Sequence, residues 1–172
     1  GVPARLGGPR FEDANGDGTL SLNDDFQIIG NPEPDFFGGI NNSLSYGNFT
    51  LDVFIQGTVG NDVYNPSALF GFFGRNVGNI YREALNRWTP ENPDSRVPRA
   101  GTVQGVTDVP SNSELVEDGT HLRLKNVRLG YTFDNVGLSW VKNLNVYVAG
   151  NNLLLLTDFR GFDPEAVGRA GG

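Results

Sequence analysis

The sequence predicts an all-β fold in which about four antiparallel strands form part of a transmembrane β-barrel, with long loops between strand pairs. Apolar and polar residues alternate through several segments of about ten residues, which is the period of a strand with two different faces. The connections inside each strand pair are short and those outside the pairs are long, an asymmetry typical of outer-membrane barrels. The 24 glycines and 10 prolines also disfavour a helical bundle.

The composition excludes several classes of function. The 172 residues contain no Cys and one His, His121, which excludes zinc–thiolate sites, Cys nucleophiles and multi-histidine metal sites. The net charge of −7 disfavours nucleic-acid binding, because that function needs a basic face. Four acids in one loop have no spacing that defines a catalytic pair, so we expect no enzymatic activity. They are Asp94, Glu114, Glu117 and Asp118.

Residues 35–56 are predicted to form the first hairpin. Gly47 and Asn48 supply a tight-turn signal between its two strands. In the second strand, apolar residues occupy one parity and mostly polar residues the other. The apolar set is Phe49, Leu51, Val53 and Ile55, and the polar partners are Thr50, Asp52 and Gln56.

Residues 120–157 are predicted to form the second hairpin, with a short connection over residues 134–143. The apolar parity changes near Lys125 and Asn126, because Leu122 and Leu124 are even-numbered whereas the apolar residues that follow from Val127 are odd-numbered. Such a change indicates a β-bulge, or a strand that passes from one environment to another.

Three further segments are predicted to be loops. They are residues 1–34, residues 57–119 and residues 158–172, the last being the start of a further loop. A short helix is expected within residues 77–88, where Ile80, Ala84 and Trp88 form one apolar stripe before Pro90. Aromatic residues of the long loop are candidates for ligand or partner contact, and a small local core is an equal alternative. They are Phe70, Phe72, Phe73 and Tyr81.

The first loop contains a calcium-type motif, Asp13-Ala-Asn-Gly-Asp-Gly-Thr-Leu-Ser-Leu-Asn-Asp24. Oxygen-bearing side chains stand at positions 1, 3, 5 and 12, and the glycine at position 6 permits the sharp turn around a hard cation. The candidate Ca²⁺ ligands are Asp13, Asn15, Asp17, Thr19 through its carbonyl, and Asp24. An Asx- and Gly-rich turn without metal is the alternative interpretation.

Several blocks, taken in order, resemble the C-terminal region of SusC/RagA-type TonB-dependent outer-membrane transporters. They are the NGDG motif from Asp13, IGNPEPDF from Ile29, NN at Asn41, NFTLDVFIQG from Asn48, NRWTPENPDSRVPRA from Asn86, VEDGTHLRLKNVRLGYTF from Val116 and LNVYVAGNNLLLLTDFRGFDPEA from Leu144. The resemblance covers nearly the whole chain. It implies a segment of a much longer protein, whose other parts would include a plug domain and a segment that contacts TonB.

The resemblance also implies function and location. It places the chain in the outer membrane, with its short turns toward the periplasm and the loops over residues 1–34 and 57–119 outside the cell. It implies an importer of oligosaccharides or peptides that acts with a SusD-type surface lipoprotein and, through the plug, with the TonB complex. The apolar strand face would then contact outer-membrane lipid.

A second function class is also compatible with the residues. The acidic, Cys-free composition and the alternating strands allow a secreted, soluble, calcium-stabilised β-sandwich that acts as a binding module. A sandwich would bury the apolar parity of its strands in its own interior, whereas a barrel segment would leave that parity exposed to lipid. The exposure of this parity therefore distinguishes the two hypotheses.

Overall fold

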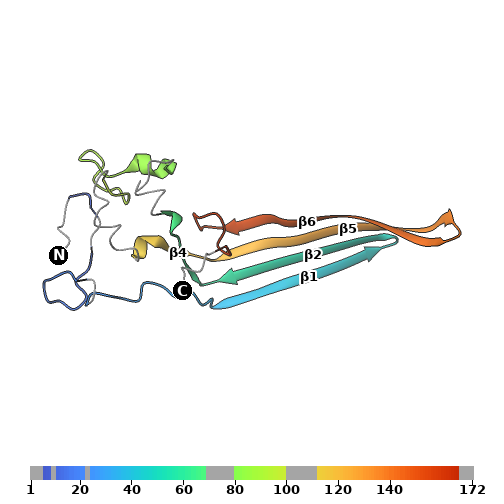
Figure 1. Ribbon diagram of the computed structural model, residues 1–172, viewed down its shortest axis with the longest axis horizontal. Helices are drawn as coiled ribbons and strands as arrows, with labels where there is room; N and C mark the ends of the chain where they lie inside the picture. The colour runs from blue at the N-terminus through green and yellow to red at the C-terminus, as the bar shows by residue number, and fades with distance from the viewer. Residues whose placement is uncertain (1–5, 9–10, 22–23, 69–79, 100–111, 167–172) are drawn as a thin grey trace. The chain divides into compact units, whose positions relative to one another are not determined.

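The computed structural model describes residues 6–8, 11–21, 24–68, 80–99 and 112–166. These residues form two compact units. The sheet unit comprises Pro32–Asp62 and Asp118–Arg160, and the loop unit comprises Gly1–Asn31, Val63–Glu117 and Gly161–Gly172. The sheet unit is one antiparallel sheet of four strands in the order β1-β2-β5-β6, which lie side by side in Figure 1. The predicted all-β antiparallel fold is confirmed.

The first hairpin joins β1 (Phe36–Tyr46) to β2 (Phe49–Val59). The strands pair from Phe36↔Val59 to Tyr46↔Phe49, so the turn consists of the two residues that the sequence indicated. Gly47 has a φ of +56°, a left-handed conformation that glycine adopts without strain. The strand β2 continues three residues beyond Gln56, where the sequence analysis ended it.

The second hairpin joins β5 (His121–Leu138) to β6 (Val141–Thr157), and its turn lies at the same end of the sheet as the first turn (Figure 1). The strands continue through most of residues 134–143, which the sequence analysis assigned to the connection. Left-handed residues near the end of β5, Asn135 and Gly137, accompany a register shift there. They resemble turn residues in sequence but form an irregular part of the strand pair.

A β-bulge lies where the apolar parity of β5 changes. Ile55 pairs with Leu124 and the preceding Phe54 pairs with Asn126, so Lys125 is one extra residue relative to β2. The bulge keeps the even-numbered leucines before it and the odd-numbered apolar residues after it on one face of the sheet. The predicted bulge is therefore confirmed, and it explains the change of parity.

The register assigns each strand residue to one of two faces. The apolar face comprises Phe36, Gly38, Ile40, Asn42, Leu44 and Tyr46 of β1, Phe49, Leu51, Val53, Ile55, Gly57 and Val59 of β2, Leu122, Leu124, Val127, Leu129, Tyr131 and Phe133 of β5, and Leu144, Val146, Val148, Gly150, Leu154 and Leu156 of β6, so Asn42 is its one polar side chain in these pairs. The polar face comprises Phe37, Gly39, Asn41, Ser43 and Ser45 of β1, Thr50, Asp52, Phe54, Gln56 and Thr58 of β2, His121, Arg123, Asn126, Arg128, Gly130 and Thr132 of β5, and Asn145, Tyr147, Ala149, Asn151, Leu155 and Thr157 of β6. Most of these residues are polar, and Phe37, Phe54 and Leu155 are the large apolar residues among them. Partners that lie directly opposite share a face, so this division follows from pairing alone.

The described part of the loop unit holds a small core. β3 (Asp62–Tyr64) and β4 (Val116–Asp118) form a two-stranded sheet, and the 3₁₀ helix η2 (Ser113–Leu115) precedes β4. Leu115 and Ala68 are buried together against Tyr64, whose pKa is raised by that burial. The expected short helix is present only as a single 3₁₀ segment, η1 (Arg82–Asn86), with Ala84 buried. No helix in the described residues is long and apolar enough to cross a membrane.

Candidate functional site

A cross-strand network of polar side chains occupies the polar face. The hydroxyl of Ser43 on β1 donates to the Asp52 carboxylate on β2 at 2.7 Å. Asp52 lies 3.9 Å from the guanidinium of Arg128 on β5, and both side chains are partly exposed. Since the ion pair is open to solvent, it orients the side chains more than it stabilises the sheet.

The network continues onto β6. The Arg128 guanidinium donates to Asn145 at 3.4 Å and stands 4.2 Å from the centre of the Tyr147 ring. The amide of Asn145 in turn donates to the Thr132 hydroxyl at 2.9 Å. Charge, hydroxyl, amide and aromatic groups are thus presented together along one surface. This combination can hydrogen-bond to and stack on polar solutes.

Two basic side chains mark the opposite end of the polar face from the hairpin turns. His121 and Arg123 are 6% and 5% exposed, and the His121 ring lies 2.9 Å from the Gly119 carbonyl. In the sequence, His121 served only to exclude multi-histidine metal sites, and in the structure its side chain is buried.

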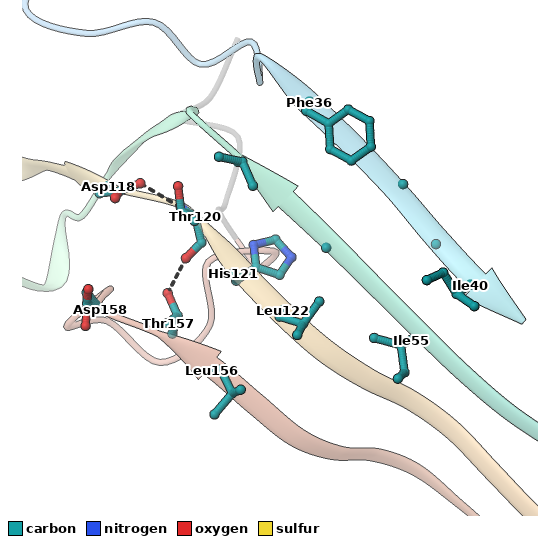
Figure 2. A pocket seen from close by; sticks show the side chains of 14 residues that line it. Phe36, Ile40, Ile55, Asp118, Thr120, His121, Leu122, Leu156, Thr157 and Asp158 are labelled. Carbon is teal, nitrogen blue, oxygen red and sulfur yellow. Dashed lines mark hydrogen bonds between the residues drawn. The ribbon is translucent and has the colours of Figure 1, made fainter.

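A groove of about 700 Å³ crosses the apolar face near the strand ends opposite the turns. Figure 2 shows Phe36, Ile40 and Ile55 over β1 and β2, with Leu122 and Leu156 on the neighbouring strands. The sequence analysis did not identify this groove, because its shape depends on which residues lie opposite one another.

The calcium-type motif folds into a tight loop around Asp13. One carboxylate oxygen of Asp13 accepts from the Gly16 and Asp17 N–H groups at 2.7 and 3.2 Å, and the other accepts from the Gly18 N–H at 2.7 Å. Asn15 and Asp17 are joined by hydrogen bonds from the Asp17 N–H to the Asn15 side chain and from the Asn15 amide to the Asp17 carboxylate. Three of the predicted ligands therefore lie in one network.

Of the other two predicted ligands, Thr19 joins this network through its N–H and not through the carbonyl predicted to bind the ion, whereas Asp24 contacts Ser21. Asp17 accepts from the Thr19 N–H at 2.7 Å, and Asp24 accepts from the Ser21 hydroxyl at 3.1 Å. The loop is closed instead by Asp25, whose carboxylate accepts from the Ala14 and Ser21 N–H groups at 2.9 and 2.6 Å.

Sequence reasoning missed Asp25 because the calcium template ends at the acid before it. The Ser21 N–H is the main cause that lowers the pKa of Asp25; burial opposes it as the next largest effect, and the Ala14 and Asn15 N–H groups lower the pKa further. Within the described residues, no group of three or more His, Cys, Asp or Glu is arranged to hold a metal ion.

Of the four loop aromatics that were candidates for ligand or partner contact, the structure describes one, Tyr81. Phe70, Phe72 and Phe73 lie outside the described residues. Tyr81 precedes η1, where its carbonyl accepts from the Ala84 N–H at 3.0 Å.

Three of the four loop acids have polar partners. Glu114 pairs with Arg96 at 3.4 Å, and Glu117 accepts from the Asn65 amide at 3.0 Å. Asp118 accepts from the Thr120 N–H at 2.8 Å, and hydrogen bonds from Thr120 lower the Asp118 pKa. Asp94 is exposed. The contacts of Glu114, Glu117 and Asp118 are of the kind that orders loops and strand ends.

No family model matches the chain. Among curated proteins, the chain is 48% identical over 165 residues to TonB-dependent receptor P26 of Formosa agariphila, a match that covers 95% of the chain and 16% of the relative. It is 38% identical over 162 residues to TonB-dependent receptor P3 of the same organism, covering 93% of the chain and 16% of the relative. The chain therefore spans 16% of the length of each of these relatives.

Solved structures give the same correspondence. The RagAB peptide importer in its closed-closed state matches with a TM-score of 0.70 and 30% identity, over 92% of the chain and 18% of the importer chain. The RagAB peptide transporter matches with a TM-score of 0.69 and 29% identity, over 86% of the chain and 16% of the transporter chain.

Proposed function

Because the chain is a segment of the barrel of a SusC/RagA-type TonB-dependent receptor, we propose that it forms part of the wall of an outer-membrane importer. Its apolar face contacts membrane lipid and its polar face lines the aqueous interior. The separation of the two faces across the bulge is the observation that carries this proposal. The extra residue Lys125 shifts the following apolar residues of β5 back onto the face that holds the preceding ones. That shift matters only where the two faces of a strand lie in different environments, as in a strand that borders lipid on one side.

The exposure of the apolar face supports a membrane rather than a sandwich. Phe49 is 52% exposed and Val148 is 67% exposed, although both are large apolar residues. Water-soluble sandwiches bury such residues between two sheets, whereas barrel strands expose them to lipid. Aromatic rings gather near the hairpin turns, where Tyr131 makes edge-to-face contacts with Phe49 and Phe133 at 4.7 and 4.6 Å between ring centres. Such a cluster suits the aromatic girdle at a membrane interface.

The polar face suits the passage of a polar nutrient. The network of Asp52, Arg128 and Tyr147 offers both charge signs and an aromatic surface. Peptide termini and backbone groups, or sugar hydroxyls and ring faces, are the chemical groups that such side chains bind. A peptide substrate is supported by the solved relatives, which are named peptide importers, and an oligosaccharide remains the second candidate.

The importer acts with a SusD-type surface lipoprotein, with the TonB complex supplying energy through the plug of the full-length receptor. The two-component name of the RagAB relatives supports such a partner. Nucleic acid is not among the proposed partners, since the chain carries a net charge of −7.

Uptake by cells tests the importer hypothesis. In a strain that lacks the full-length receptor, growth on its peptide or oligosaccharide nutrient is expected to stop, and the intact gene is expected to restore it. A receptor that fractionates with the outer membrane but whose loss leaves uptake of both nutrient classes unchanged would refute the proposed function. Affinity purification from detergent extracts then tests whether a surface lipoprotein accompanies the receptor.

We further propose that the calcium-type loop binds Ca²⁺ and stabilises an outer loop of the receptor. The donor set is carboxylate and amide oxygen, which a hard cation prefers, and Asp13, Asn15 and Asp17 already lie in one network. Calorimetric titration of the full-length receptor with Ca²⁺ should show a binding event that Asp13→Ala removes. Equal titration curves for the two proteins would show that the loop is a metal-free turn.

A further inference from the structure

Two phenylalanines lie on the polar face, between the middle of the sheet and the strand ends opposite the hairpin turns. Phe54 of β2 pairs with Asn41 of β1 and with Asn126 of β5, and Phe37 of β1 pairs with Thr58 of β2. Phe37 is 74% exposed, although it is a large apolar side chain on the face assigned to water. Lipid contact explains the exposed rings of the apolar face but not these two.

The Phe54 ring lies over the backbone of β1 at Gly39. A Cβ at Gly39 would come within 2.8 Å of Cε2 of this ring, so glycine leaves the ring its place. Gly39 pairs with Gln56, the next residue of β2 on the polar face, and the ring therefore reaches from its own row toward the strand ends opposite the turns. This direction leads away from the ion pair of Asp52 and Arg128. Phe54 is partly exposed, so part of its ring remains open to the interior.

Amide side chains surround the Phe54 ring. Asn41 on β1 and Asn126 on β5 stand on its two sides, and Gln56 follows it on β2. Asn41 is exposed, and the Asn126 amide donates to the Asn151 side chain at 2.8 Å. An amide both donates and accepts hydrogen bonds without carrying a charge. The site therefore offers an apolar ring beside uncharged donors and acceptors.

We propose that Phe54 and Phe37 form a stacking site for the sugar rings of an oligosaccharide that passes through the receptor. This proposal rests on the proposed function, because the polar face must line the aqueous interior for a solute to reach the two rings. One face of a pyranose ring consists of C–H groups, and its edge carries hydroxyls. It can therefore pack on an aromatic ring while its hydroxyls bond to the neighbouring amides.

The site favours an oligosaccharide over a peptide. Arg123, which pairs with Gln56, is 5% exposed, so its charge is little available to the ionised C-terminus of a peptide. The exposed amide of Asn41 is uncharged, as sugar hydroxyls are. Phe37 lies nearer than Phe54 to the strand ends opposite the turns, which the sequence resemblance places outside the cell. An entering sugar chain would therefore reach Phe37 first and Phe54 next.

Four substitutions separate stacking from simple apolar packing. Phe54→Leu keeps an apolar side chain over Gly39 but removes the ring face, whereas Phe54→Tyr keeps the ring. Phe37→Leu removes the second ring. Its matched control is Phe36→Leu, the same substitution at the neighbouring residue, which lies on the apolar face and is 67% exposed.

Equilibrium dialysis of the full-length receptor in detergent measures binding to two fluorescently labelled pools. One pool holds short oligosaccharides from plant and algal polysaccharides, and the other is a tryptic digest that supplies peptides. Phe54→Leu and Phe37→Leu should each lower the apparent association constant for the oligosaccharides about two- to tenfold. Phe54→Tyr and Phe36→Leu should leave this constant unchanged.

The outcomes separate the sugar site from the proposed function. Oligosaccharide binding that is as strong in both leucine variants as in the unaltered receptor would overturn the site, and the rings would then serve packing within the barrel, as an aromatic ring over a strand glycine does. If Phe54→Leu fails to assemble, equal binding by Phe37→Leu and Phe36→Leu would overturn it. Binding of peptides alone, or of neither pool, would also overturn it. The importer itself fails only if loss of the receptor leaves uptake of both nutrient classes unchanged.

Discussion

Two neighbouring asparagines of β1 provide a matched test of the two faces. Asn41 pairs with Phe54 on the polar face, and Asn42 pairs with Val53 on the apolar face. Both side chains are exposed, and they are the sixth and seventh of the 11 residues of the strand. Replacing each in turn by arginine places the same charge at nearly the same depth but on opposite sides of the barrel wall.

The expected effect follows from the length of the strand. Eleven residues at a rise of about 3.4 Å extend about 37 Å, and a tilt of about 40° reduces this to roughly 28 Å across the membrane, close to the height of a barrel's apolar band. Asn42 therefore lies near the middle of the bilayer, where arginine on the lipid face costs about 2–4 kcal/mol. Asn41→Arg faces water, so its effect should be within about 0.5 kcal/mol.

The assay is urea-induced unfolding of the full-length receptor in lipid vesicles, followed by tryptophan fluorescence. Asn42→Arg should lower the free energy of unfolding by the amount expected for the lipid face, and Asn41→Arg should leave it nearly unchanged. Equal effects of the two substitutions, or a larger effect of Asn41→Arg, would refute the assignment of the faces.

Three further substitutions test local features. Asn48→Ala removes two hydrogen bonds from the first turn to acceptors on β5. It should lower the free energy of unfolding by about 1–2 kcal/mol in the same assay. No change would show that the turn is held by its backbone alone. The lowered pKa of Asp25 means that its contribution is complete above the ordinary value of 3.8 and is lost as the pH falls through the lowered value. Protection of the Ser21 amide from hydrogen exchange should therefore persist at pH 3.8, be lost only at lower pH, and be absent at neutral pH in Asp25→Ala, which has no side-chain acceptor; unchanged protection in Asp25→Ala would contradict the contact. Gly7→Ala puts a Cβ into the Trp88 ring at a φ of +75° and should destabilise the loop by more than about 1 kcal/mol. This would be measured as faster proteolysis of that loop, and an unchanged rate would contradict the contact.

The strand pattern could be predicted from sequence because the alternation of apolar and polar residues has the two-residue period of a strand with two different faces. The bulge at Lys125 was also predictable, since an extra residue must reverse the parity of the apolar positions that follow it. The end of β5 was not, because Asn135 and Gly137 have the residue types of a turn but occupy an irregular stretch of strand. Residue types alone do not distinguish a turn from an irregular stretch of strand.

The candidate sites depended on contacts that sequence does not record. The groove exists because Gly38 lies opposite Gly57, and this pairing is visible only once the register is known. The role of Asp25 required the path of the chain after Ser21, since a template places its last ligand by counting residues. The expected helix over residues 77–88 is limited in the described residues to one 3₁₀ segment, Arg82–Asn86, because an apolar stripe three positions long permits a helix without requiring one.

Spin labels along β5 test the assignment of lipid and water most directly. The chain contains no cysteine of its own, so single cysteines can be introduced one at a time from residue 121 to residue 131 in a full-length receptor freed of other cysteines. We expect collisions of the spin label with oxygen, which dissolves in lipid, to peak at even positions up to Leu124 and at odd positions from Val127. Collisions with a water-soluble nickel reagent should peak at the alternate positions. An alternation that continues unbroken through Lys125, or oxygen maxima at Arg123 and Arg128, would contradict this expectation.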